Sequence, residues 1–530
     1  MKLNIRLSIT IIITVVYFII HFIIANDYGL SWDYHYHNYA GRFHIGLPIP
    51  SIQDPAPVPF SPPDPRLTVE DPFGPFTQII PSFSQYLFYE RLHILPFDTA
   101  YDLPMIVFGA LGVGLVFYLL SDIVGLAAGF AGAAFLGLMP VYFGYLHNDM
   151  KDIPNAFAFS LAVYCFWKLE MKRNLRTLLL AILSFAFAFN VKINSIMIPV
   201  VCGVWFLMIH RTELIGIIRG KLHSIINNRL WIVVVYFITA PVAAVLMWLP
   251  FWKDPFGKLL ELPYFYSNNT INMPVLLFGN IFRSGFNIPP YYPYVYLGIT
   301  IPLPILIFFV IGIVYASQTL RRGNRFSLLL LLWFFIPILR YLSPKAGAID
   351  GVRHFMEIVY PLSMISALGV YWLFHKFFLR KKLLIFGIVI SCITVGMLIL
   401  EDVYYHPYQT SYFNPFIGGI RGAWGKFDID FWGTPQKEAI SWLNANVPPN
   451  SSVYIVMAQS TAATYLRPDL LKYVNTKSIA ESDYVVVLNR ETFFTVYDVS
   501  NYITGKTIHK PVAFERTIDG VPLVWVFKNR

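Results

Sequence analysis

The chain has 530 residues, of which 56% are apolar, 17% aromatic and only 13% charged. Soluble domains carry about 25% charged residues, so this composition excludes a soluble fold and predicts a polytopic α-helical membrane protein. The net charge of +10 would suit a nucleic-acid partner, but the positions of the charges argue against one. Cys165, Cys202 and Cys392 all lie in apolar runs, which supports neither a disulfide framework nor a zinc cluster.

Stretches of about 17 to 25 nearly uncharged residues predict the membrane-spanning helices, and we expect about eleven of them. They lie near residues 7–25, 103–120, 123–145, 154–168, 177–191, 193–209, 230–252, 294–316, 327–342, 355–375 and 383–400. The segment 79–96 is too polar to span because it carries Glu90 and Arg91. It predicts an amphipathic helix on the membrane surface.

The connections between these spans alternate in charge. The N-terminus, the turn at 121–122 and four connections hold 17 Lys and Arg against 3 Asp and Glu; the connections are 168–176, 210–229, 317–326 and 375–382. Basic loops stay in the cytoplasm, so the pattern predicts an inner-membrane protein with a cytoplasmic N-terminus and an outer C-terminus. It also explains the basic net charge without nucleic acid.

The composition changes after residue 400. A helix is predicted over 435–446, and apolar, strand-like runs occupy 452–457, 484–488 and 522–527. We therefore expect two domains: a membrane domain over residues 1–400 and a small α/β domain over residues 401–530 outside the cytoplasm.

The first outer connection, residues 26–102, has the densest set of chemically active side chains. Asp33 is the leading candidate for a general base or for a carboxylate that positions the acceptor. Aromatic neighbours and partial burial would raise its pKa towards that use. Trp32, Tyr34 and Tyr36 beside it suit the apolar face of a sugar.

Two histidines accompany these aromatic residues. His35 is a further candidate for substrate binding. His35 and His37 could also hold a metal, but no third ligand is evident, and hydrogen bonds to water or backbone are the simpler account.

The next outer loop packs His147, Asp149, Lys151 and Asp152 into six residues. Lys151 is a candidate contact for a phosphate, and Asp149 or Asp152 could position that lysine or a metal ion. Asp152 precedes Pro154 at the start of a predicted span and reads as a helix cap.

Three further basic residues lie at the same predicted face. Lys192 stands between two spans, where an ion pair and a lipid phosphate are equally good partners. Arg353 could bind a phosphate with two hydrogen bonds, or could pair with Asp350 or Glu357. His354 follows Arg353, directly before the predicted span 355–375.

The order of these motifs is similar to one known group. The acidic-aromatic first loop is followed by KDIP at 151–154, RHF at 353–355, HPYQTSYFN at 406–414 and GAWGKFDIDFWG at 422–433. Together they resemble the bacterial glycosyltransferase family 39-like proteins of the GT-C superfamily. Dolichyl-phosphate-mannose protein mannosyltransferases and lipid A aminoarabinose transferases are relatives of that group. The likeness covers the membrane part and the start of the tail.

The resemblance implies a GT-C fold and an inverting transferase of hexosyl or mannosyl type. Its donor would be a monosaccharide on a polyprenyl phosphate, and its base an acid of the first loop, which maps to Asp33. The family's pattern there is an Asp-Glu pair, but here Tyr34 follows Asp33. Asp149 or the pair Glu70 and Asp71 are therefore candidates for the second carboxylate.

The chemistry expected from these residues is simple. Lys151 and Arg353, with Lys192 or His354, would stabilise the departing phosphate, while Asp33 deprotonates an acceptor hydroxyl on a protein, lipid or glycan. No cofactor is needed beyond the lipid-linked donor, although Asp149 leaves a divalent metal open.

Two other classes of function compete with this one. A transporter or flippase of a lipid-linked glycan would place charges at mid-span and repeat its halves, whereas the charges here gather at one face. A non-catalytic membrane scaffold would leave the acidic-aromatic first loop unexplained.

Overall fold

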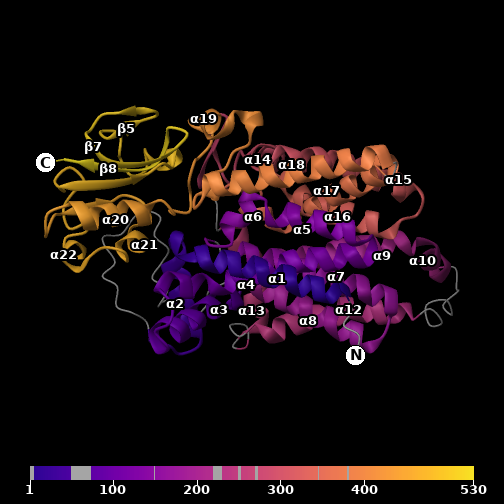
Figure 1. Cartoon of the computed structure of the whole chain (residues 1–530). Helices are drawn as coiled ribbons and strands as arrows, with labels where there is room; N and C mark the ends of the chain where they lie inside the picture. The colour runs from indigo at the N-terminus through magenta and orange to yellow at the C-terminus, as the bar shows by residue number, and fades with distance from the viewer. Residues whose placement is uncertain are drawn as a thin grey trace.

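The computed structural model describes residues 5–48, 73–148, 150–218, 229–248, 252, 254–268, 272–343, 345–378 and 381–529. A long helix bundle forms one part of the molecule, and a smaller α/β unit built by the C-terminal residues lies at one end of it (Figure 1). Helix α10 (Arg211–Ile218) lies at the opposite end of the bundle (Figure 1).

Among the described residues, eleven helices form the body of the bundle, and each predicted span overlaps one of them. They are α1 (Ile5–Ile24), α4 (Phe97–Ile123), α5 (Leu126–Gly137), α7 (Asp152–Lys172), α8 (Leu175–Val191), α9 (Met197–Ile209), α12 (Leu230–Met247), α15 (Leu303–Arg321), α16 (Arg325–Leu339), α17 (Val359–Leu373) and α18 (Lys381–Tyr405). Within the described ranges, 7 helices are long and apolar enough to cross a membrane. The predicted polytopic helical fold is therefore confirmed. Of the other four helices, α5, α8 and α9 are shorter than a full span, and the longer α7 is not among the seven either.

Sequence features explain how individual helices start and pack. Asn174 starts α8 with a capping box, accepting the Thr177 N–H at 3.0 Å. Helices α15 and α17 approach closely through two glycines. A Cβ on Gly312 would lie 1.8 Å from the Ile365 carbonyl oxygen, and one on Gly369 would lie 2.3 Å from that of Phe308. Small residues permit such close packing in membrane bundles.

Short helices and one hairpin connect the bundle. They are α6 (Pro140–Tyr145), α13 (Pro255–Asn268), α14 (Tyr292–Thr300) and the antiparallel pair β1 (Pro274–Leu277) and β2 (Asn280–Arg283).

The first outer connection folds against the bundle. It contains α2 (Tyr34–His44), α3 (Pro75–Gln85) and a π-helical turn, η3 (Tyr86–Arg91). The helix expected near 79–96 thus begins at 75 and ends at 91, and one of its faces packs on α2. Gly41 makes this contact, because a Cβ there would lie 2.1 Å from the Gln78 carbonyl oxygen.

The C-terminal unit is a sheet covered on both faces. Its strands β3 (Val453–Ile455), β4 (Tyr484–Leu488), β7 (Val512–Ile518) and β8 (Val521–Lys528) have the order β3-β4-β8-β7. The β3–β4 pair is parallel and the other pairs are antiparallel. Helix α20 (Gln436–Asn446) packs on the face that carries Val524 and Val526, and Phe493 packs on the face that carries Trp525.

The remaining elements of this unit are short. They are α19 (Gly419–Ala423), α21 (Gln459–Ala463), α22 (Pro468–Leu471), β5 (Ile503–Thr504) and β6 (Thr507–Ile508).

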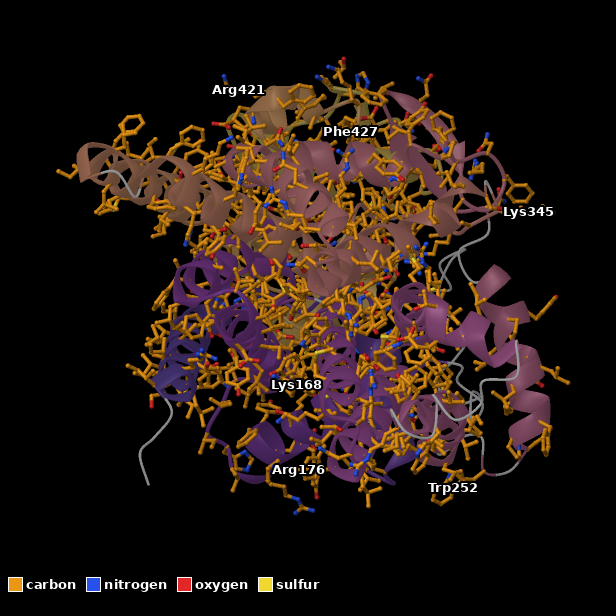
Figure 2. The ribbon with its side chains drawn as sticks, turned by 90° about the vertical axis from the view of Figure 1, so that its right-hand side faces the viewer. Lys168, Arg176, Trp252, Lys345, Arg421 and Phe427 are labelled. Carbon is orange, nitrogen blue, oxygen red and sulfur yellow. The ribbon has the colours of Figure 1, made fainter. Side chains whose placement is uncertain are left out.

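The start of the tail is joined to the bundle. Helix α18 runs to Tyr405, and Phe413, Phe427 and Trp432 share one apolar core with the membrane helices. Figure 2 looks along the bundle from the α10 end and shows Arg421 and Phe427 near the top of the molecule, with Lys168 and Arg176 in the lower half. Residues after α18 therefore shape the end of the bundle where the predicted site residues lie.

Candidate active site

Three segments that are distant in the sequence meet around Asp33. Asp33 directly precedes α2, Lys151 directly precedes α7, and Arg353 opens the 3-10 turn η7 (Arg353–Ile358) before α17. The Lys151 Nζ lies 2.8 Å from Asp33 Oδ2, and Arg353 Nη2 lies 3.0 Å from the same oxygen. The structure thus brings together three of the predicted site residues.

Arg353 is the centre of a larger cluster. Besides Asp33, its Nη1 lies 2.9 Å from Asp350 Oδ2 and its Nε lies 3.4 Å from Asp152 Oδ2. The guanidinium stacks on the Trp432 ring, with Cζ 4.4 Å from the ring centroid. Three carboxylates and an aromatic face together restrict the orientation of this guanidinium.

Each of these carboxylates faces a second basic side chain. Asp33 pairs with Lys151, Asp152 with Lys192, and Asp350 with Arg490 at 2.7 Å. The described residues contain no His, Cys, Asp and Glu group suited to a metal ion. Because the three carboxylates each contact two cations, this cluster does not fit a resident divalent metal.

The cations determine the charge state of Asp33. Burial raises the pKa of its carboxyl, but Lys151 and Arg353 outweigh that effect and hold the pKa well below its usual range. The expectation that burial raises this pKa overall is therefore wrong. Both ion pairs use Oδ2, and Oδ1 accepts no hydrogen bond from the described residues. The side chain is 33% exposed, so an ionised oxygen is open to a ligand.

His37 lies beside this carboxylate. Burial and the nearby Lys151 lower the pKa of His37 well below its usual range, so the ring is neutral. The Gln78 amide Nε2 donates to its Nδ1 at 3.2 Å. The histidine thus contributes polarity to the cluster without charge.

The predicted sugar-binding residues lie in different surroundings. Tyr34 is buried between α2 and α3, where its hydroxyl donates to Gln85 Oε1 at 3.1 Å. His35 Nε2 lies 3.3 Å from Thr464 Oγ1 of the tail. Trp32 lies under Arg490, and Tyr36 packs edge-on against Phe73. Trp32 therefore contacts a residue of the ion cluster.

Of the remaining predicted site residues, the structure describes Lys192 and His354. Lys192 forms an ion pair with Asp152, which was predicted as a helix cap. The His354 carbonyl accepts hydrogen bonds from Arg340, from Tyr341 at 3.3 Å and from Asn194 at 3.1 Å. Asp149, Glu70 and Asp71 lie outside the described residues.

Two residues of the cluster, Trp432 and Arg490, were not predicted from the sequence as site residues. Asp350 was predicted as one possible partner of Arg353, and the structure shows that pair; Asp350 and Gly351 both have a left-handed backbone, with φ +53° and +66°. Nothing local marked Arg490, which follows β4 by two residues.

Comparisons with known proteins agree with the sequence motifs. Residues 97–248 match the family described as dolichyl-phosphate-mannose-protein mannosyltransferase. This segment runs from α4 to α12 and includes Lys151, Asp152 and Lys192. No curated protein matches the chain in sequence.

Two solved proteins resemble it in structure at 12% sequence identity. The archaeal oligosaccharyltransferase AglB from Archaeoglobus fulgidus, in complex with an inhibitory peptide and a dolichol-phosphate, has a TM-score of 0.47, covering 91% of this chain and 69% of that chain. ArnT from Cupriavidus metallidurans covers 98% of this chain and 97% of its own, with TM-scores of 0.47 in the apo state and 0.45 bound to undecaprenyl phosphate. The family match over residues 97–248 supports the resemblance to membrane glycosyltransferases of the GT-C superfamily that the motifs predict.

Proposed function

We propose that the protein is an inverting glycosyltransferase that moves a monosaccharide from a polyprenyl phosphate to an acceptor hydroxyl. The main observation behind the proposal is that Asp33 forms ion pairs with both Lys151 and Arg353. A partly exposed carboxylate therefore lies beside two cations. The matched family supports a lipid-phosphate donor, since its description names dolichyl-phosphate-mannose.

The two cations would bind the donor phosphate. Lys151 and Arg353 would turn from Asp33 towards the phosphate oxygens, with Lys192 and His354 adding polar surroundings behind them. As the glycosidic C–O bond breaks, its electron pair passes to the phosphate oxygen, and the cations stabilise that growing charge. Arginine suits this role because its guanidinium stays charged and can bind a phosphate with two hydrogen bonds.

Asp33 would act on the acceptor. Its Oδ1 would take the hydroxyl proton while the hydroxyl oxygen attacks the anomeric carbon on the face opposite the phosphate, which inverts the configuration. Transfer of the cations to the phosphate would also remove the cause of the low pKa of Asp33, so the carboxylate would become more basic once the donor is bound.

Location in the membrane follows from the same proposal. The basic connections would lie in the cytoplasm and the cluster at the outer face of the inner membrane, where a polyprenyl tail can remain in the bilayer. The acceptor would be a hydroxyl of a protein, a lipid or a glycan.

The test is turnover of a radiolabelled polyprenyl-phosphate monosaccharide by purified protein in detergent. We expect sugar release by the wild type, and weaker but still measurable donor binding in Lys151→Gln and Arg353→Gln. Lys345→Gln is the matched control, because Lys345 is an exposed basic residue of the same outer loop and lies outside the cluster. Absence of both donor binding and turnover in the wild type would refute the proposal.

A lipid flippase is distinguished in proteoliposomes. If the wild type moves the labelled lipid between leaflets without cleaving the sugar–phosphate bond, the rival function holds. Cleavage with inverted product configuration, read by NMR, supports the transferase.

A further inference from the structure

The cluster around Arg353 has a regular composition. Each of its three carboxylates is shared between Arg353 and one further cation, and these cations are Lys151, Lys192 and Arg490. Four basic and three acidic side chains therefore leave one net positive charge among the described members. Lys151 and Lys192 belong to the bundle, whereas Arg490 comes from the C-terminal unit.

Arg490 is held firmly at the end of β4. Its guanidinium lies over two rings, with Cζ 4.2 Å from the Phe493 centroid and 5.2 Å from that of Trp32. The preceding Asn489 anchors the backbone, since its N–H donates to the Leu523 carbonyl at 2.9 Å. A buried cation with so little freedom can fix the position of its partner at a small entropic cost.

Its partner Asp350 is fixed as well. Asp350 and Gly351 both have a left-handed backbone, and the Tyr292 hydroxyl donates to the Gly351 carbonyl at 3.2 Å. This turn places Oδ1 of Asp350 against Arg490 and Oδ2 against Arg353. One carboxylate thus links the tail to the residue that faces Asp33.

We propose that Arg490 is a positioning residue for the donor-phosphate site, acting on Arg353 through Asp350. By occupying one oxygen of Asp350, Arg490 prevents that carboxylate from taking Arg353 with both oxygens and turning it away from Asp33. It also supplies the charge that makes the cluster positive. The C-terminal unit then contributes to the site through Arg490. This inference rests on the proposed function, since its ligand is the donor phosphate.

Arg490→Gln removes the charge and leaves Asp350 with Arg353 alone. We expect it to weaken binding of a radiolabelled polyprenyl phosphate by about tenfold, a factor in the range of interaction energies between neighbouring groups. Arg490→Lys keeps the charge and should restore most of the affinity. A positioning role predicts that Arg490→Gln has little further effect in an Arg353→Gln background.

Lys437→Gln is the matched control. Lys437 also joins the tail to the bundle, with its Nζ 2.6 Å from Asp98 Oδ2, but it lies outside the cluster. If Arg490 served only to dock the tail, both variants would weaken binding by a similar factor, and their effects would add to that of Arg353→Gln. That additive result would overturn the inference.

The outcome also separates this inference from the proposed function. If the wild type binds polyprenyl phosphate and Arg490→Gln binds it equally well, the inference alone fails. If the wild type binds no polyprenyl phosphate, both fail. Thermal unfolding of each variant in the same detergent identifies any variant that has lost its fold. If Arg490→Gln is unfolded, binding of polyprenyl phosphate is compared between Arg490→Lys and the wild type, and a loss in Arg490→Lys as large as the one expected for Arg490→Gln would overturn the inference.

Discussion

Replacement of Asp33 by asparagine isolates the role of its carboxylate. Asparagine has nearly the same shape, and its amide oxygen can still accept hydrogen bonds from Lys151 and Arg353, which contact a single oxygen of Asp33 at 2.8 and 3.0 Å. It cannot take a proton from an acceptor hydroxyl. We therefore expect turnover to fall while donor binding is preserved.

The structure also sets the size of the effect. General-base catalysis contributes about 10² to 10⁴ in rate, and its efficiency is greatest when the pKa of the base lies near the working pH. Lys151 and Arg353 hold the pKa of Asp33 well below that range, against the effect of burial, and their transfer to the donor phosphate would raise it during turnover. We therefore expect a loss of at least a hundredfold, which corresponds to about 3 kcal/mol or more of activation free energy.

The assay separates turnover from binding. The rate of sugar release is measured at saturating donor, and the affinity for polyprenyl phosphate is measured separately. With one charge removed from between the cations and the phosphate, that affinity should be unchanged or higher. Asp27→Asn is the control, since Asp27 is an exposed carboxylate of the same connection, 55% exposed, that pairs with His406. Turnover within tenfold of the wild type in Asp33→Asn would show that this carboxylate is not the base.

Three further predictions concern stability, each checked by unfolding in detergent. Lys437→Gln should lower the free energy of unfolding by about 2 kcal/mol, because it leaves Asp98, whose side chain is 3% exposed, without its cation; an unchanged midpoint would contradict this. Burial raises the pKa of Asp430 to about 6, above the unfolded value. The folded state then binds more protons, so stability should fall as the pH rises from about 4 to about 6, by about 3 kcal/mol for this group, and Asp430→Asn should flatten that slope. Asn174→Ala should cost about 1 kcal/mol by removing the α8 capping box, and Thr177→Ala should reproduce part of the loss.

Local patterns predicted most elements and failed where an element depends on distant neighbours. The predicted strands 484–488 and 522–527 correspond to β4 and β8, because continuous apolar runs mark strands that are covered on both faces. Strand β7 was missed: its residues include Glu515 and Arg516, and it is ordered by pairing with β8. Helix α3 was expected on the membrane surface, and that position stays a prediction. The sequence did not predict that its polar residues Gln78, Ser82 and Gln85 are buried inside the protein.

By itself the sequence determined the membrane character, the positions of the spans and the candidates Asp33, Lys151 and Arg353. These features depend on the apolarity and charge of short segments, because those two properties determine which segments enter the bilayer. Only the tertiary structure decided which charges meet. Asp33 and Arg353 are separated by 320 residues, and Asp350 and Arg490 by 140. Their ion pairs, and the pKa of Asp33 that depends on them, arise from electrostatic interactions across a few ångströms of space, which no local pattern in the chain specifies.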